Sequence, residues 1–234
     1  RVAVVAVPLV AYRNGALLDA ARLVEAAHRA GALVVLDAYQ AVGIVPIDVH
    51  ALGVDALVAG TNKWLGAPAT GCAFLYVARA LAERLSPAYP GWLGHAEPFG
   101  FCDEFVPAPG ARRFEQGAPA VEPIYGARAG IRCALDVGVE AMRARSLALC
   151  DRLIAVADEL AIPLATPRAH AERAGFVCLR VPDPDRAVAE LRERGIDADT
   201  RPGTGVRFSA HPCNSDDDLA QVVAYLRASR RAPS

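Results

Sequence analysis

The order of apolar and amphipathic stretches constrains the fold of this chain more than any other feature of its sequence. Residues 2–7 read VAVVAV and residues 33–36 read LVVL, and residues 17–30 between them place apolar side chains at helical spacing before Gly31. A strand, helix, strand order of this kind predicts a parallel sheet with a right-handed crossover. Because residues 2–7 are apolar without interruption, we expect that strand to be buried on both faces.

The rest of the chain predicts a second, smaller unit. Residues 56–59 and 72–77 have the composition of two more strands, and the Pro- and Gly-rich stretch 86–121 is typical of a long functional loop. Residues 123–160 predict one long helix or two consecutive helices. Shorter strand and helix patterns follow at 176–181, 185–194, 197–200, 206–209 and 216–227. The expected fold class is α/β, with a large sheet domain over residues 1–140 and a small α+β domain over residues 141–234 that includes a linking helix.

Charge and cysteine usage exclude several classes of function. The 25 Lys and Arg residues nearly balance the 26 Asp and Glu residues, and no basic block would suit nucleic acid or an anionic membrane surface. The apolar start is too short to span a bilayer. Six cysteines without a CxxC pair disfavour a zinc site or a disulfide framework, and they suit reduced thiols. We therefore expect a cytoplasmic protein that acts on a small molecule and binds no metal.

The beginning of the chain leads to one more expectation. The sequence opens on Arg1 and enters its first strand at once, without an initiator methionine or a preceding helix. We expect that an N-terminal part of the large domain is missing from it.

Lys63 is the only lysine among the 25 basic Lys and Arg side chains. A chain that uses arginine everywhere else needs a primary amine at this position, because a guanidinium cannot lose its proton and attack a carbonyl. Asp37 ends one predicted strand, and Lys63 follows the next. Since ligands bind at the carboxyl ends of strands in open parallel sheets, we expect both side chains at one edge. A carboxylate and an amine placed there are the two protein groups that pyridoxal phosphate requires.

The same residues carry a resemblance to a known family. Residues 35–48 read VLDAYQAVGIVPID, residues 53–55 read GVD and residues 61–66 read TNKWLG. This pattern resembles the class V aminotransferase superfamily of fold-type I pyridoxal phosphate enzymes, and the similarity covers nearly the whole chain. The resemblance implies the three-layer, parallel-type sheet of that large domain, pyridoxal 5'-phosphate as cofactor and an amino acid as substrate.

The resemblance also implies roles for individual residues. Asp37 would pair with the pyridine nitrogen, Gln40 would hydrogen-bond the phenolic oxygen of the cofactor, and Lys63 would form the Schiff base. Arg207, within the VRFS stretch 206–209, matches the arginine that holds the substrate carboxylate. A planar guanidinium suits that role because it binds a carboxylate with two parallel hydrogen bonds.

The phosphate contacts depart from the family pattern. Asn62 occupies the place of a His or Tyr in relatives, and Gly60 stands where many relatives have a phosphate-binding serine, which leaves Thr61 as the nearer hydroxyl.

Two further stretches would bear on the phosphate. Residues 90–95, PGWLGH, resemble the tryptophan loop of kynureninases, so Trp92 would reach the phosphate. Residues 113–119, RFEQGAP, resemble a stretch whose backbone at Gly117 and Ala118 would serve the phosphate of a neighbouring subunit. A homodimer with shared active sites is therefore expected.

Several activities remain open within this resemblance. Hydrolytic cleavage of a carbon–carbon bond, as in kynureninases, is favoured by Tyr12 and Arg13 and by the Trp92 loop. Gln40 in place of a histidine favours an aminotransferase, epimerase or lyase of another substrate. Cysteine desulfurase is disfavoured because residues 197–206 contain no cysteine. A catalytically silent subunit with the same fold is the alternative of a different class.

Overall fold

A computed structural model of the chain describes residues 2–67 and 72–231. The chain divides into two compact units. The first contains Arg1–Val7, Ala20–Tyr39 and Asp48–Arg132, and the second contains Pro8–Asp19, Gln40–Ile47 and Cys133–Ser234. The boundary expected at residue 140 stays a prediction.

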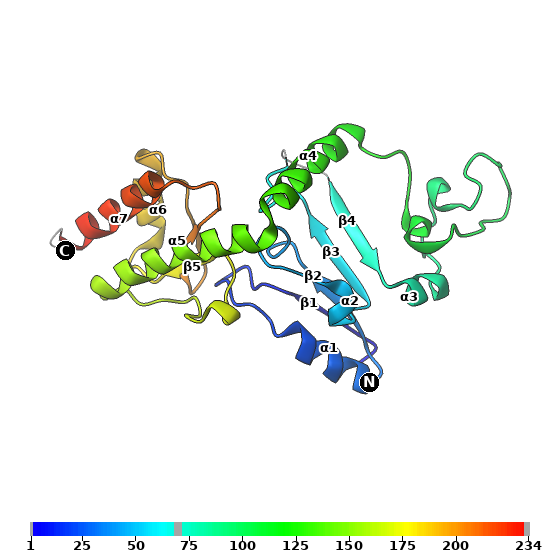
Figure 1. The fold of residues 1–234 in the computed structure, drawn as a ribbon, viewed down its shortest axis with the longest axis horizontal. Helices are drawn as coiled ribbons and strands as arrows, with labels where there is room; N and C mark the ends of the chain where they lie inside the picture. The colour runs from blue at the N-terminus through cyan, green and yellow to red at the C-terminus, as the bar shows by residue number, and fades with distance from the viewer. Residues whose placement is uncertain (1, 68–71, 232–234) are drawn as a thin grey trace. The chain divides into compact units, whose positions relative to one another are not determined.

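The first unit is built on a four-stranded sheet. Figure 1 shows its strands side by side in the order β1 (Val4–Pro8), β2 (Leu33–Asp37), β3 (Ala56–Gly60) and β4 (Ala73–Val77). Strands β2 and β3 pair in parallel and β3 and β4 pair antiparallel, so the sheet is mixed. Helix α1 (Ala20–Arg29) packs on β2, and the short helices α2 (Val49–Leu52) and α3 (Arg79–Arg84) precede β3 and follow β4. The strands predicted at 33–36, 56–59 and 72–77 are confirmed.

Strand β1 differs from the expectation of burial on both faces. Val4 is 49% exposed, and exposed and half-buried residues alternate along the strand. The prediction of burial on both faces is therefore wrong, since none of the residues of β1 is buried.

A half-buried acceptor, Asp55, links α1 to the central strands. Asp55 Oδ2 accepts a hydrogen bond from Val34 N at 2.7 Å, and His28 Nε2 lies 2.8 Å from the same oxygen. One carboxylate therefore joins the end of α1, the beginning of β2 and the approach to β3. The result is a fixed register in which Asp37 lies opposite Val58.

The stretch 86–121 has more local structure than a loop prediction implies. It contains two 3-10 helices, η1 (Trp92–Gly94) and η2 (Gly110–Phe114). The buried Arg113 anchors it, because its Nε donates to Ala108 O at 3.1 Å and its Nη1 donates to Leu85 O at 2.8 Å. The loop is thus tied to the end of α3 through the backbone carbonyls that its arginine binds.

Two consecutive helices follow the loop, which settles the alternative left open by the sequence. Helix α4 (Val121–Val137) ends at Gly138, and α5 (Val139–Glu159) begins directly after it. Gly138 has φ 88°, a left-handed conformation that glycine adopts without a steric penalty and that interrupts the helix. None of the described helices is long and apolar enough to cross a bilayer.

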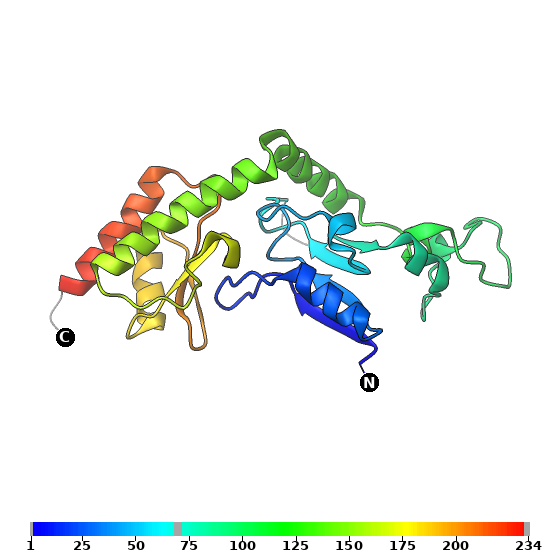
Figure 2. The same ribbon diagram turned by 60° about the horizontal axis from the view of Figure 1, so that its bottom comes forward.

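The second unit is a small α+β domain. Strands β5 (Phe176–Leu179), β7 (Gly205–Ser209) and β6 (Asp199–Arg201) form an antiparallel sheet in that order. Helices α5 and α6 (Pro184–Glu193) lie against it, and α7 (Asp216–Arg231), red in Figure 2, packs on α5. The core between helices and sheet consists of buried apolar side chains, among them Leu149, Leu153, Leu179, Leu191, Phe208 and Leu226.

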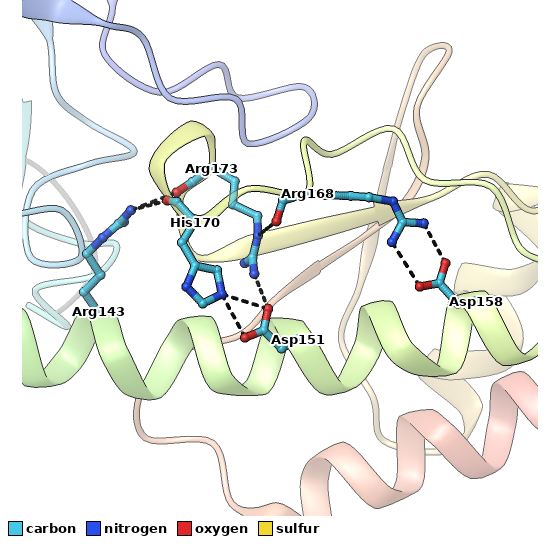
Figure 3. A network of polar contacts seen from close by, with 6 residues as sticks. All are labelled: Arg143, Asp151, Asp158, Arg168, His170 and Arg173. Atoms are coloured by element: carbon cyan, nitrogen blue, oxygen red, sulfur yellow. Dashed lines mark hydrogen bonds and ion pairs between the residues drawn. The ribbon is translucent and has the colours of Figure 1, made fainter.

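A buried arginine organises the segment between α5 and β5, which carries the 3-10 helix η3 (His170–Glu172). The Arg173 side chain is fully buried and pairs with Asp151 on α5, and its Nε donates to Arg168 O at 3.2 Å. Asp151 also lies 2.9 Å from His170 Nε2, as Figure 3 shows. Since Arg173 Nη1 is buried without a hydrogen-bond partner, the Asp151 carboxylate is the main compensation for its charge.

Candidate active site

Asp37 and Lys63 lie at the same edge of the first unit's sheet. Asp37 is the last residue of β2, and β3 ends at Gly60, three residues before the lysine. The turn after β3 is closed by two backbone hydrogen bonds, from Ala67 N to Thr61 O at 3.1 Å and from Gly66 N to Lys63 O at 2.9 Å. The parallel pairing of β2 and β3 therefore brings a carboxylate and an amine, far apart in the sequence, to neighbouring strand ends.

A pocket of about 550 Å³ opens at this edge. Its lining includes the side chains of Asp37, Tyr39 and Asn62 together with the ends of β3 and β4. The Asp37 carboxylate is exposed, and only its Oδ1 has a described partner, the backbone N–H of Tyr39 at 2.8 Å. An exposed carboxylate at the carboxyl end of a strand can accept a hydrogen bond from a protonated ring nitrogen. The type and the position of these residues therefore fit pyridoxal phosphate.

Tyr39 is the residue of this pocket that the sequence analysis did not single out. Its hydroxyl donates to Asn62 Oδ1 at 2.6 Å, and the Lys63 Nζ lies 4.2 Å from the centre of its ring. The available signal was Gly60, because a lone glycine in a strand often marks the close approach of another group.

Thr61 and Asn62 differ in what their side chains do. The buried Thr61 hydroxyl donates to Cys72 O at 3.1 Å, so it ties the lysine turn to the beginning of β4. Asn62 is exposed and lines the pocket, where its amide nitrogen is oriented by the bond that Oδ1 accepts from Tyr39. Their contacts to a phosphate stay predictions.

Helix α4 packs closely against the turn that carries Lys63. A Cβ on Gly130 would lie 2.2 Å from Leu65 O, a distance that no side chain can occupy. Only a glycine therefore lets the helix approach the turn that carries Lys63 this closely.

Trp92 and Gly117 are neighbours in the first unit. A Cβ on Gly117 would lie 3.8 Å from the Trp92 Nε1, and the Trp92 ring packs edge-on against Phe99 at 5.5 Å. Ala118 is exposed beside them. The lining of the Asp37 pocket includes none of these three residues, so their place in the site stays a prediction.

Arg207 lies in the second unit, on β7, and its guanidinium is already organised. Its Nε donates to Asp199 Oδ1 at 2.8 Å, and its Nη1 donates to Tyr12 O at 2.7 Å. Asp199 is the direct cross-strand partner of Arg207 on β6, and it also pairs with Arg201 at 2.9 Å. The Arg207 guanidinium lies over the Phe176 ring, 5.2 Å from its centre. Gln40, half-buried in a turn, belongs to the same unit.

The side chain opposite Arg207 on β5 is Cys178. Burial raises the pKa of the Cys178 thiol, and its Sγ donates to Arg13 O at 3.2 Å. A thiol that stays protonated is a poor nucleophile, so the cysteine nearest to Arg207 in the sheet is not suited to sulfur transfer.

Comparison with known proteins places these residues in a family. The model of the family "Aminotransferase class-V" matches residues 1–229. The chain belongs to the class-V aminotransferase family. A kynureninase of Deinococcus radiodurans is 36% identical to this class-V chain over 97% of its length and 57% of the relative. An uncharacterised aminotransferase of Bacillus subtilis, YcbU, is 32% identical over 95% of this chain and 58% of the relative.

Solved structures of the same fold support this assignment. A cysteine desulfurase of Thermococcus onnurineus superimposes with a TM-score of 0.88 at 26% identity, covering 97% of this class-V chain and 60% of that protein. A C-DES variant with glycine covalently linked to its PLP cofactor gives a TM-score of 0.85 at 22% identity, over 96% of this chain and 60% of that one. The expected family and α/β fold are confirmed, and the chain spans somewhat more than half the length of these relatives.

Proposed function

We propose that this class-V chain forms the catalytic part of a pyridoxal phosphate enzyme that acts on an amino acid. The observation that carries the proposal is the placement of the Asp37 carboxylate and the only lysine at the ends of two parallel neighbouring strands, beside one pocket. When bound, pyridoxal phosphate supplies an electron-withdrawing ring that stabilises negative charge on the substrate.

Different residues of the chain would bind different parts of pyridoxal phosphate. Asp37 would hold a proton on the ring nitrogen, because its exposed carboxylate has an oxygen free of the hydrogen bond from Tyr39 N. Lys63 would be the covalent attachment point, and Gln40 would contact the phenolic oxygen. The phosphate would be held by the side chains of Thr61, Asn62 and Trp92. The backbone at Gly117 and Ala118 would serve the phosphate bound by a neighbouring subunit.

Arg207 would hold the carboxylate of the substrate. The Nε and Nη2 edge of its guanidinium faces Asp199, so the substrate carboxylate would bind the edge formed by Nη1 and Nη2. The cross-strand carboxylate keeps the guanidinium in one orientation and leaves a net positive charge on the pair of Arg207 and Arg201, both of which contact it. A preorganised cation of this kind favours a substrate with an anionic end.

The reaction we favour is hydrolytic cleavage of a carbon–carbon bond, as the name kynureninase states for the Deinococcus radiodurans relative. The similarity to the Bacillus subtilis aminotransferase supports amino-group transfer as the second candidate. Desulfuration is disfavoured because burial raises the pKa of the Cys178 thiol, the cysteine opposite Arg207.

The setting of the enzyme is also part of the proposal. Homodimer formation is supported by the aromatic surface of the loop 86–121, where Tyr89 is 83% and Phe101 is 91% exposed. A cytoplasmic location is supported by the six free cysteines. An amino acid is the proposed small-molecule partner.

Labelling with the cofactor tests the proposal directly. The full-length protein is mixed with pyridoxal phosphate, so that an amine bonds to the aldehyde carbon and the aldehyde oxygen leaves as water. Borohydride then reduces the resulting bond, and peptide mass mapping locates the label. We expect it on Lys63. A label elsewhere, or none, contradicts the proposal and favours a catalytically silent subunit.

A substrate test separates the two candidate reactions. Hydrolysis needs only water as the second reactant, so protein loaded with pyridoxal phosphate should consume kynurenine without any added oxo acid. Amino-group transfer needs a 2-oxo acid as acceptor, so turnover that appears only when an oxo acid is added identifies an aminotransferase.

A further inference from the structure

Tyr39 contacts three positions of the segment that carries the lysine. Its ring lies against Gly60, its hydroxyl donates to Asn62 Oδ1 at 2.6 Å, and its ring centre is 4.2 Å from Lys63 Nζ. The residue is half-buried and lines the pocket beside Asp37. One aromatic side chain therefore spans the space between the end of β2 and the turn after β3.

Gly60 is present because of this ring. A Cβ on Gly60 would lie 1.9 Å from Tyr39 Cε2 and 2.7 Å from Tyr39 Cδ2, distances at which the ring must move away. The backbone of Gly60 does not itself require glycine, since its φ is outside the left-handed region that ten other glycines of the described residues occupy. Close approach of the ring is the remaining reason for a glycine at the last position of this paired strand.

The contact with Lys63 has a definite electrostatic sense. The face of an aromatic ring carries partial negative charge, so an ammonium at 4.2 Å from its centre is attracted to it. Lysine has a flexible four-carbon stem, and its amine takes a defined position only when neighbouring groups hold it. The bond to Asn62 fixes the outer end of the ring, so the surface presented to the amine is itself fixed.

We propose that Tyr39 is a positioning residue that holds the Lys63 amine over the pocket lined by Asp37, and that Gly60 and Asn62 serve to seat its ring. This inference deepens the proposed function and rests on it only for the step in which the cofactor attaches. The position of the amine itself does not depend on any cofactor.

The Lys63 signals can be assigned selectively. In full-length protein grown with [13C]lysine, they are the side-chain NMR signals that Lys63→Arg removes, and protons above a ring face are shifted upfield. We expect this upfield shift in the unchanged chain and in Tyr39→Phe, which keeps the ring. We expect its loss in Tyr39→Leu, and also in Gly60→Ala, where the new methyl group displaces the ring. Tyr125→Leu, which changes an exposed tyrosine of the same unit outside the loop 86–121, is the matched control and should leave the signals unchanged.

A rate measurement adds a second readout. Attachment of pyridoxal phosphate to Lys63, followed by borohydride trapping and mass analysis, should be slower in Tyr39→Leu than in Tyr39→Phe, because the amine is then no longer held in position. Circular dichroism identifies any variant that fails to fold, and Tyr39→Phe retains a readable result in that case. Unchanged Lys63 signals in both Tyr39→Leu and Gly60→Ala would overturn the inference. Failure of the unchanged chain to attach the cofactor would instead count against the proposed function, while the NMR result would stand.

Discussion

Removal of the charge of Asp151 is expected to destabilise the second unit far more than removal of the charge of Asp158, about two turns further along the same helix. Asp151 compensates the fully buried Arg173 guanidinium, whereas Asp158 pairs with Arg168, a contact in which both side chains are more than half exposed. In Asp151→Asn the guanidinium stays buried without a counter-charge. In Asp158→Asn both groups are already in contact with water, and exposed ion pairs contribute little.

The magnitude follows from the burial of the two partners. Breaking a fully buried ion pair by changing one member typically costs about 3–5 kcal/mol. Asp151 is 47% exposed, so water screens part of the interaction and we expect about 2–3 kcal/mol for Asp151→Asn. With a urea dependence of about 1–3 kcal/mol per molar, this corresponds to an unfolding midpoint lower by about 1 M.

The assay has to report on the second unit. Trp64 and Trp92 both lie in the first unit, so tryptophan fluorescence follows the wrong part of the chain. Far-UV circular dichroism is suitable because α5, α6 and α7 belong to the second unit. Asp158→Asn is the matched control, with the same chemical change on the same helix.

A double variant distinguishes lost charge compensation from general damage. Arg173→Met combined with Asp151→Asn removes the buried charge together with its partner, and apolar replacements of buried ion pairs are often neutral. We expect the double variant to regain most of the stability that Asp151→Asn loses. Equal midpoints for Asp151→Asn and Asp158→Asn, or a double variant less stable than Asp151→Asn, would refute the reasoning.

Four further predictions concern the site, the assembly and the buried thiol. Asp37→Asn should keep pyridoxal phosphate bound but lose most turnover, because an amide cannot hold the ring nitrogen protonated. Absorbance of the bound cofactor and steady-state kinetics measure the two effects, and unchanged turnover would contradict the prediction. Arg207→Ala should raise KM for the amino acid by about 30-fold or more with the cofactor spectrum unchanged, and loss of the cofactor instead would mean that Arg207 serves the phosphate. The full-length protein should be a dimer in analytical ultracentrifugation, with the loop 86–121 forming the contact between subunits. An active monomer at low concentration would contradict shared active sites. Burial raises the pKa of the Cys150 thiol from 9.0 to about 12, so its contribution to stability is complete below pH 9 and is lost as the pH rises towards 12; a thiol reagent at neutral pH should label the exposed Cys213 and spare Cys150, as mass mapping can check.

Local patterning determined the elements of this protein and the places of its reactive groups. The strands that end at Asp37 and before Lys63 follow from apolar runs, because runs this short and rich in valine are typical of buried strands. Their convergence follows from the topology, since parallel neighbours end at the same edge. These inferences need only residues near each other in the chain.

Contacts between side chains distant in sequence were decided by the tertiary structure alone. The approach of Tyr39 to Gly60 depends on the direction that the chain takes after β2, and the pairing of Arg207 with Asp199 depends on the register of β6 against β7. A one-residue change of register would move such a side chain to the other face of the sheet, so sequence spacing cannot specify its partner. The type of chemistry could therefore be predicted from the sequence. The groups that orient the amine and the guanidinium could be identified only from the paired strands, because the orientation of a side chain depends on its packing.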